Sequence, residues 1–480
     1  MIRWGILGAG NIAKRFAASL ENIEDAELYA ISGRSEEKLE SFRNQYPCNK
    51  TYTDHLELIK DERVDAIYLA LPHGLHCEYA CLALAAKRPV LCEKPAAMSA
   101  AEMKQIRECS KQNQTLFMEA MKTRFVPLYR KLRTLIKDEK IIGDITRVET
   151  SLCISLPKEY FGKTYHTDPV MGGALLDSGI YCASWLEDYC DGDIRMEKTL
   201  ANLYGPVNMY VKGTMKIGDA DAVLETAFDR SREKTATIYG TAGTVIVPEL
   251  HRPVKAQISV NHADTYTLEE PYEHDDFYGQ IRHFMDLIKH GNTESDIMPL
   301  NDSVRCAEIL DILRDGFTAY DQSDLDLLAC QEKALSFTGF SKEDAEKLGN
   351  LITDITREFT GPVAVRITSE TEESVWFEKI MDGKSERNLT FAEMKRNAVK
   401  LTGHSSAWAA IDQKVHPERY SGIDNYYPTA GAFPVFVGGK HVATVAVSGL
   451  HEGLDHNLLT RAISSYLGVD EPNTIKKAII

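Results

Sequence analysis

Residues 2–13, IRWGILGAGNIA, decide the fold of the N-terminal part of the chain. The apolar run Ile2–Leu7 predicts a β-strand, and a glycine-rich turn leads from it into a helix. Gly8 permits a tight turn, Gly10 lets the backbone approach a pyrophosphate, and Ala13 allows the helix to pack closely. The motif is weak alone, but its setting between a strand and a helix favours a dinucleotide site over a plain turn. The expected cofactor contacts here are Gly8, Gly10, Asn11 and Ile12.

The first 120 or so residues alternate short apolar runs with charged, helix-like stretches. This order is typical of a parallel, doubly wound sheet, so we expect an α/β Rossmann domain over residues 1–122. In such a sheet a residue that ends a later strand reaches the same edge as the glycine turn. Strands are expected at residues 2–7, 27–32, 66–71, 90–93 and 115–119.

The middle of the chain has a different pattern, with longer alternating segments. We expect an α+β domain with an open, mostly antiparallel sheet over residues 123–320. Its strands are expected at 146–154, 208–217, 222–229 and 234–239, and its closing helices at 276–290 and 300–317. The polar residues 319–326 are the best candidate for a linker.

All ten cysteines lie between Cys48 and Cys330, and this change in composition suggests that a separate unit follows. The pattern predicts helices at 342–359 and 391–402, strands at 363–367 and 374–379, and a glycine-turned hairpin of 433–437 with 441–447.

Length and charge limit the class of protein. A chain of 480 residues with 44% hydrophobic content can fill two or three cores. Its net charge of −16 argues against nucleic acid or a membrane surface as partner, so small molecules are expected. No apolar stretch approaches a spanning helix, the N-terminus enters a strand directly, and the cysteines have no paired metal spacing. We therefore expect a cytoplasmic protein without a metal site.

The second strand indicates which dinucleotide binds. A carboxylate at its end would hold the ribose 2′-hydroxyl of NAD, but this chain has Ser32-Gly33-Arg34, with Lys38 one helical turn later. NADP is therefore favoured, with contacts at Ser32 and Arg34. Two alternatives stay open: Arg34 is a solvated loop residue, or the site accepts NAD as well.

Lys94, in Glu93-Lys94-Pro95, is the expected acid–base residue. Oxidation of a secondary alcohol needs a base for the hydroxyl proton while hydride leaves the carbon for the nicotinamide. Burial and the positive charge of oxidised nicotinamide are expected to lower the pKa of Lys94. Pro95 favours an extended Lys94, and a cis bond between them would aim the lysine at the site. The alternative is an exposed loop lysine.

Asp177 and Tyr181 are spaced i, i+4, which places them on one face of a helix opened by Gly172-Gly173. Tyr181 is expected to hydrogen-bond or pass a proton to the reacting oxygen. Asp177 is expected to position a neighbouring hydroxyl or to hold Lys94. The alternative is that both are ordinary residues of a half-buried helix.

Five ordered motifs resemble those of the Gfo/Idh/MocA oxidoreductases, over residues 1 to about 320. They are the glycine turn, Pro72-His73 with His76, Glu93-Lys94-Pro95, residues 119–127 (EAMKTRFVP) and residues 172–181 (GGALLDSGIY). The resemblance implies cofactor contacts at Pro72, His73, His76, Glu93 and Lys94. His73 and His76 are expected to line the cofactor site and cap a helix, not to carry protons. Glu119 and Arg124 are expected to be architectural, with substrate contact by Arg124 as the alternative.

Tyr181 stands where most of that family has histidine, which resembles the dihydrodiol dehydrogenase and NADP-dependent D-xylose dehydrogenase branch. The branch implies a pyranose sugar or a cyclic trans-diol as substrate, and activity on CH–OH groups or, alternatively, on CH–CH groups. Lys122 departs from it, because the branch usually has a large aromatic residue there. That departure leaves the substrate open.

Residues 327–470 resemble a small-domain family related to the GlcG/HbpS haem-degrading-like proteins. The resemblance rests on residues 428–434 (PTAGAFP), Val437-Gly438-Gly439 and residues 447–456 (VSGLHEGLDH), although Ala432 replaces a usual glycine. It implies a compact, profilin- or PAS-like α/β domain that self-associates. In this chain such a domain is expected either to support a homo-oligomer or to shape the entrance of the substrate pocket. The scattered histidines His404, His416, His441, His451 and His456 are expected at the surface and in turns, not in a metal or haem site.

Three functions remain. The first is an NADP-dependent sugar or diol dehydrogenase. The second is a glycoside-modifying enzyme that holds NAD(P) tightly for transient oxidation. The third is a cofactor-sensing regulatory protein, for which the intact Lys94 and Tyr181 are awkward.

Overall fold

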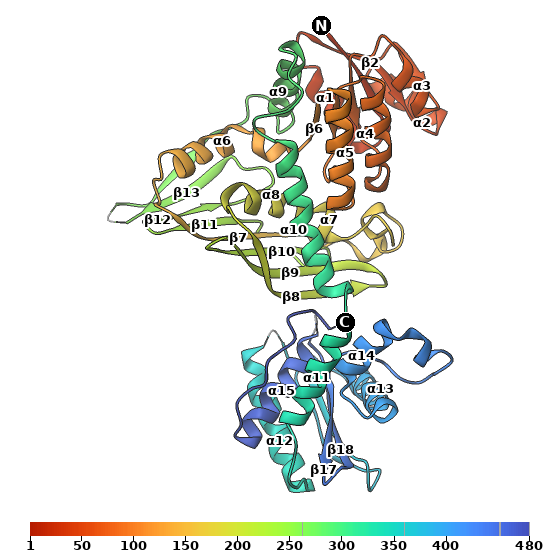
Figure 1. Ribbon diagram of the computed structural model, residues 1–480, viewed down its shortest axis with the longest axis vertical. Coiled ribbons are helices and arrows are strands. Elements are labelled where there is room, and N and C mark those ends of the chain that lie inside the picture. Colours follow the sequence, from red (N-terminus) through yellow and green to blue (C-terminus); the bar gives the residue numbers. More distant parts are fainter. Residues whose placement is uncertain (262, 360, 451–452, 480) are drawn as a thin grey trace. The chain divides into compact units, whose positions relative to one another are not determined.

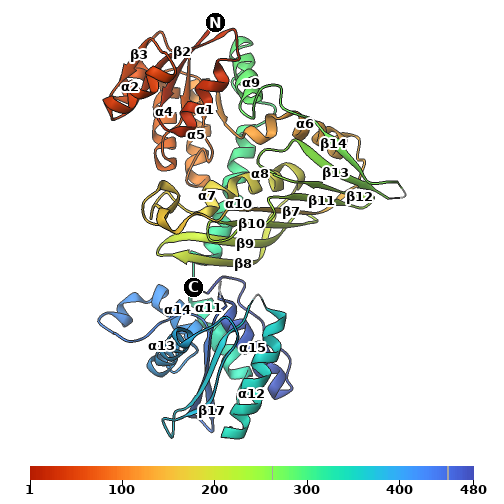
Figure 2. The same cartoon turned by 180° about the vertical axis from the view of Figure 1, so that it is seen from behind.

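The computed structural model describes residues 1–261, 263–359, 361–450 and 453–479. The chain divides into two compact units. The first unit comprises residues 1–197 and 204–313, and the second comprises residues 198–203 and 314–480. Figures 1 and 2 show both units from opposite sides.

The first unit begins with a six-stranded parallel sheet in the order β3-β2-β1-β4-β5-β6. The strand order reverses between β1 and β4, and in such sheets ligands bind outside the carboxyl ends of the strands at this point. Strands and helices alternate as the sequence predicts; β3 was not foreseen. The elements are β1 (Ile2–Leu7), α1 (Asn11–Leu20), β2 (Ala26–Ser32), α2 (Glu36–Gln45), β3 (Lys50–Tyr52), α3 (His55–Lys60), β4 (Ala66–Leu69), α4 (His76–Ala85), β5 (Val90–Cys92), α5 (Ala100–Asn113) and β6 (Phe117–Glu119).

Side-chain alternation along β1 explains how helices cover both faces of this sheet. Trp4 packs edge-on against Phe16 of α1, 5.1 Å between ring centroids. Gly5 faces the other way, toward Leu58 of α3. On that second face α4 and α5 pack side by side (Figures 1 and 2). The sheet is therefore buried on both faces, which is why its strands are continuous apolar runs.

The rest of the first unit is built on an eight-stranded sheet in the order β14-β13-β12-β11-β7-β10-β9-β8, of which β8 belongs largely to the second unit. Among the described residues β7 and β10 pair in parallel, whereas the pairings of β10 with β9 and from β7 through β14 are antiparallel, so the sheet is mixed and mostly antiparallel, as expected. β8 and β12–β14 were not foreseen. The strands are β7 (Ile145–Cys153), β8 (Ile194–Tyr204), β9 (Val207–Ile217), β10 (Ala220–Ala227), β11 (Ala236–Gly240), β12 (Gly243–Val247), β13 (Lys255–Val260) and β14 (Tyr266–Glu269).

Helix α8 packs on β7 and β10 of this sheet (Figure 2). The helices are α6 (Pro127–Arg133), α7 (Ala174–Asp177), α8 (Gly179–Tyr189), α9 (Tyr278–Lys289) and α10 (Leu300–Thr318). One continuous helix was expected through Asp177 and Tyr181. That expectation is wrong, because the helix is interrupted at Ser178, between the end of α7 and the start of α8.

The second unit has a four-stranded antiparallel sheet in the order β16-β15-β18-β17. The predicted hairpin is present: Gly438 and Gly439 join β17 to β18 with φ of 56° and 80°, the backbone that a two-residue turn requires. Its elements are α11 (Gln322–Ala334), α12 (Lys342–Ile355), β15 (Ala364–Ser369), β16 (Val375–Ile380), α13 (Glu386–Thr402), α14 (Ser406–Val415), β17 (Ala432–Val437), β18 (Lys440–Ser448) and α15 (Leu454–Leu467).

Helices cover both faces of this sheet as well. Val445 and Val447 of β18 pack in one core with α12 and α15, whereas Ala446 between them packs with Ala392 and Val399 of α13. The period of two along β18 thus separates the two layers.

The polar linker expected at residues 319–326 is mostly helical. Asp321 caps α11 in a capping box with Asp324, so residues 322–326 form the first turns of that helix. Polar residues in a helix's first turn resemble a loop in sequence, which explains the error. In the described part of the chain, no helix is both long and apolar enough to span a membrane.

Candidate active site

The glycine turn after β1 lies at the point where the strand order reverses. Gly8 has φ +102°, and a Cβ there would lie 2.5 Å from the carbonyl oxygen of Ala70. A Cβ on Gly10 would meet no atom within 4 Å. Gly10 also precedes α1 without a capping side chain, so the first amides of α1 have no side-chain partner there. This open, amide-lined start of a helix fits the pyrophosphate of a dinucleotide, with Asn11 and Ile12 in its first turn.

The two residues at the end of β2 that are expected to contact the cofactor have different surroundings. The Ser32 hydroxyl is buried and lies 2.8 Å from Nδ1 of His55. The Arg34 side chain is exposed, next to Ser35, which caps α2 by accepting from the amide of Lys38. Of the two side chains, Arg34 is therefore the one placed to meet a ligand phosphate.

Lys94 follows β5 and meets Asp177 from α7. Its Nζ donates to the backbone oxygen and to Oδ1 of Asp177, both at 2.9 Å, and lies 4.9 Å from the ring centroid of Tyr181. The side chains of Lys94 and Asp177 are 12% and 18% exposed. The Lys94–Pro95 peptide bond is cis. Despite the break at Ser178, the structure brings the three expected catalytic residues together.

The expected lowering of the Lys94 pKa is wrong for the protein alone. Burial does lower it, but Asp177, Tyr181 and Glu93 together raise the pKa of Lys94 above its ordinary value. Asp177 contributes most to this rise, because its carboxylate lies only 2.9 Å from the ammonium group. Lys94 is thus held as an ammonium group at neutral pH.

Tyr181 and Glu93 are also buried beside Lys94. Burial raises the pKa of Tyr181 despite the opposing effect of Lys94, so its phenol keeps its proton. Glu93 accepts from the hydroxyl of Tyr68 at 2.5 Å and from the amide of Lys94 at 3.2 Å, and burial raises the pKa of its carboxyl. Glu93 therefore supports the loop that carries Lys94.

His73 and His76 lie beside this loop but do not cap a helix with their rings. The ring of His76 lies between two backbone oxygens, with Nδ1 2.8 Å from Pro95 and Nε2 2.8 Å from Leu71. His73 follows Pro72 and is buried, which lowers its pKa to about 3. Burial also lowers the pKa of His76, against the opposing effect of its two carbonyl contacts. These contacts give His76 a place in fixing the loop that carries Lys94.

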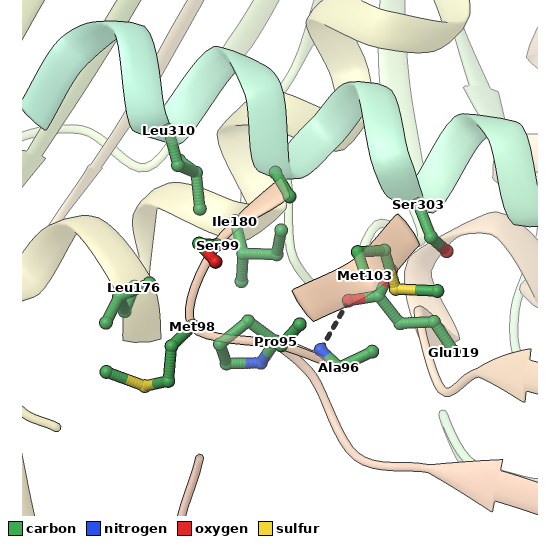
Figure 3. A pocket seen from close by; sticks show the side chains of 12 residues that line it. Pro95, Ala96, Met98, Ser99, Met103, Glu119, Leu176, Ile180, Ser303 and Leu310 are labelled. Carbon is green, nitrogen blue, oxygen red and sulfur yellow. Dashed lines mark hydrogen bonds between the residues drawn. The ribbon is translucent and has the colours of Figure 1, made fainter. Parts of the chain in front are cut away.

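A small cavity of about 10 Å³ lies behind the Lys94–Pro95 loop (Figure 3). Pro95, Ala96 and Met103 line it together with Glu119, whose Oε1 accepts from the amide of Ala96 at 2.9 Å. Its size is near the smallest that holds one water molecule, so no substrate enters it. Glu119 thus has the architectural role that the sequence favours.

Arg124 is not brought to the group around Lys94. It is buried, and its guanidinium donates to Asp302 at 2.6 Å, to both oxygens of Ser184 and to Glu187. These buried partners occupy all three guanidinium nitrogens, so Arg124 is not available for the substrate contact that the sequence left as an alternative.

Two residues near Asp177 were missed by sequence reasoning. Nδ1 of His166 is buried without a hydrogen-bond partner, and burial lowers the pKa of its ring against the opposing effect of Asp177. The ring of Tyr165 lies 6.0 Å from that of His73, and the residue is 52% exposed. Both belong to the loop before Gly172-Gly173, whose aromatic content was the available signal.

The histidines of the second unit are scattered. His404 pairs with Glu332 at 2.6 Å, His441 lies 3.0 Å from the Thr444 hydroxyl, and His416 ends α14. His456 is not at the surface as expected: it is fully buried, with Nε2 2.9 Å from Gln331. His451 lies outside the described residues. Among those described, no three His, Cys, Asp or Glu side chains are arranged for a metal ion.

Comparison with protein families finds three matches along the chain. Residues 2–121 match the oxidoreductase family with an NAD-binding Rossmann fold, and residues 129–246 match the GFO/IDH/MocA C-terminal domain. Residues 340–464 match the haem degrading protein HbpS-like family. These matches confirm both resemblances, and with them a nicotinamide dinucleotide as cofactor.

Curated relatives align with about two thirds of the chain. The trans-1,2-dihydrobenzene-1,2-diol dehydrogenase of Xenopus laevis is 28% identical, over 64% of this chain and 96% of that protein. The NADP⁺-dependent scyllo-inositol 2-dehydrogenase of Bacillus subtilis is 27% identical, over 65% and 96%. The NADP⁺-dependent D-xylose 1-dehydrogenase of Hypocrea jecorina is 26% identical, over 67% and 93%.

Solved structures support the fold of the same region. KijD10, a 3-ketoreductase from Actinomadura kijaniata, in complex with NADP and TDP-benzene, gives a TM-score of 0.58 at 24% identity, covering 65% of this chain and 97% of that one. The aldose-aldose oxidoreductase of Caulobacter crescentus gives 0.60 at 19%, covering 65% and 96%.

Proposed function

Because the chain carries both domains of the Gfo/Idh/MocA oxidoreductases, followed by an HbpS-like domain, we propose that it is an NADP-dependent dehydrogenase of sugar-like alcohols. The substrate class is a pyranose, a cyclic polyol or a trans-diol, reacting at a secondary CH–OH group. The observation that carries the proposal is the buried contact of Lys94 with Asp177 and Tyr181 at the carboxyl edge of a Rossmann sheet. Relatives named as diol, inositol and xylose dehydrogenases support the substrate class.

The cofactor would be held by the turn after β1 and the end of β2. The amides that begin α1 would bind the pyrophosphate, where Gly8 and Gly10 keep side chains out of the way. Arg34 would bind the 2′-phosphate of NADP. Pro72, His73 and Glu93 would line the nicotinamide side, next to Lys94.

Lys94 is the proposed acid–base residue. When bound, the oxidised nicotinamide accepts hydride from the substrate carbon and brings a positive charge to the site. A positive charge close to Lys94 opposes its ammonium form, so a neutral Lys94 takes the hydroxyl proton as the C–H bond breaks. In the reverse direction the ammonium form, which Asp177 stabilises, donates that proton to the carbonyl oxygen.

Asp177 and Tyr181 complete the proposed site. Asp177 fixes the Nζ of Lys94 through two acceptors and keeps it aimed at one place. The protonated phenol of Tyr181 donates to the reacting oxygen. This division suits the structure, because Tyr181 keeps its proton whereas Lys94 is the group whose charge changes.

A spectrophotometric panel tests the proposal. Purified protein is mixed with NADP⁺ or NAD⁺ and with pentoses, hexoses, glycosides, inositols and cyclic trans-diols, and the nicotinamide absorbance is followed. Reduction of NADP⁺ by one substrate class is the expected result. Cofactor that survives purification, without net reduction, would instead indicate transient oxidation, and binding without any turnover would indicate a regulatory protein.

Arg34→Ala is expected to weaken NADPH binding by roughly 10- to 100-fold, because a charged hydrogen bond to a phosphate contributes about 1.5–3 kcal/mol. NADH affinity should stay within about twofold, since NADH lacks that phosphate. Fluorescence titration with both nucleotides measures this, and Arg43→Ala, an exposed arginine of the same helix region, is the control. Equal losses for both nucleotides would refute the phosphate contact.

We also propose that the HbpS-like domain supports self-association, as the resemblance implies. Light scattering on the full chain is expected to give a dimer or larger oligomer. A monomer at micromolar concentration would contradict this role.

A further inference from the structure

Three cationic side chains converge on Asp276, the second residue before α9. Arg15 of α1 reaches its Oδ1 at 2.5 Å, and Arg252 reaches its Oδ2 at 3.1 Å. Lys122, from the turn after β6, also donates to Oδ2. Asp276 and Lys122 are each 5% exposed at the side chain. We call these four residues the Asp276 cluster.

The cluster has more positive than negative charge. One carboxylate faces three cations, and in the described part of the chain no other carboxylate lies within ion-pair distance of Arg15, Lys122 or Arg252. The neighbouring Asp275 is turned away, with Oδ1 accepting from Ser19 and from the first amides of α9. If Asp276 served only to link two parts of the fold by an ion pair, one cation would be enough. The two additional positive charges therefore favour a second anion at this place.

The cluster adjoins the proposed catalytic group. Nζ of Lys122 lies 6.0 Å from the ring centroid of Tyr181, and Nζ of Lys94 lies 4.9 Å from the same centroid. The ring of His251 lies 5.9 Å from that of Tyr181, and its buried Nδ1 has no hydrogen-bond partner. A sugar-sized molecule that reacts beside Lys94 and Tyr181 is therefore within reach of Lys122.

The energetics of Lys122 also favour an additional anion. Burial, with smaller contributions from Arg252 and Arg15, lowers the pKa of Lys122 to about 8 against the opposing effect of Asp276. A buried ammonium with insufficient negative charge is costly, and a bound anion would remove that cost. Arg15 and Arg252 are 38% and 48% exposed at the side chain, so their guanidinium groups remain accessible to a carboxylate or phosphate.

We propose that Lys122, Arg252 and Arg15 form a subsite for an anionic group of the substrate, so that the enzyme prefers a sugar-like alcohol bearing a carboxylate or phosphate. The inference rests on the proposed dehydrogenase function. In this proposal Lys122 determines specificity: its positive charge favours an anionic substrate, whereas a pocket for a neutral sugar would need no cation there.

The test compares glucose, glucuronate and glucose 6-phosphate, which share a ring and differ in the group at C6. Wild-type kcat/KM is expected to be at least about tenfold higher for one of the anions than for glucose. Lys122→Met is expected to remove that preference, so that kcat/KM for the anion falls toward the value for glucose. Whichever anion is preferred identifies the group; equal rates for all three would overturn the proposal.

A second variant keeps the test independent of folding. Lys122→Met leaves Asp276 paired with both arginines, whereas Arg252→Gln changes a half-exposed side chain and should also lower the anion preference. Lys131→Met, an exposed lysine of α6, should not. An NADPH affinity that falls in parallel with the preference would assign the cations to the cofactor and overturn the substrate subsite.

Binding separates this inference from the proposed function. Calorimetry in the presence of NADPH is expected to show glucuronate or glucose 6-phosphate binding more tightly than glucose, and only with Lys122 present. If no alcohol is oxidised but this pattern holds, the subsite stands and the dehydrogenase function falls. If sugars are oxidised but the anions bind no better than glucose, the subsite falls alone.

Discussion

Lys94→Met is expected to lower kcat at least a hundredfold while NADPH affinity stays within about threefold. General acid–base catalysis contributes roughly 10²- to 10⁴-fold, and in this site Lys94 is the group whose proton the reaction exchanges. Methionine nearly preserves the volume of the buried side chain, so the loss isolates the amine. The measurement is kcat from NADP⁺ reduction with saturating substrate, alongside a fluorescence titration of NADPH.

Controls separate the amine from its neighbourhood. Lys111→Met changes an exposed lysine of α5 and should leave kcat unchanged. Lys94→Arg keeps the charge beside Asp177 but has no proton to exchange near neutral pH, so it too should lose activity. Turnover within a few-fold of wild type in both Lys94 variants would show that another group carries the proton.

The Rossmann sheet was predictable because strands buried on both faces are unbroken apolar runs. The strands that escaped prediction lack that signal. β3 has three residues, none of them buried, and β14 is mostly exposed. Helix α11 was obscured by the polar residues of its first turn, which resemble a linker.

The sequence predicted which motifs contribute to the candidate site, but not how their side chains contact one another. Lys94 and Asp177 are 83 residues apart, and only the fold shows that they form an ion pair. In the protein without cofactor the pKa of Lys94 is raised, and the 2.9 Å contact with Asp177 contributes most to that rise. The sequence-based expectation combined burial with the charge of the nicotinamide and could not include this contact. Lys122 and Asp276 are 154 residues apart, so the sequence marked Lys122 as unusual without revealing its partner.

Asp177→Asn is expected to move the pH dependence of alcohol oxidation to lower pH. Burial lowers the pKa of Lys94, and Asp177 is the largest of the groups that raise it again. Without that negative charge the pKa falls, because burial is then opposed only by Tyr181 and Glu93. Oxidation needs neutral Lys94, so kcat rises as pH passes the pKa. The rising limb should shift down by roughly 1–3 pH units, the usual effect of one nearby opposite charge.

The shape of the profile distinguishes this positioning role from a structural one. A merely damaged site would lower kcat by the same factor at every pH. Loss of the ion pair instead shifts the rising limb of kcat along the pH axis. Asp168→Asn is the matched control, since its carboxylate binds the amides of Val170 and Met171 in the same loop and does not contact Lys94. An Asp177→Asn profile that superimposes on the wild type after scaling would mean that Asp177 does not set the charge of the catalytic group.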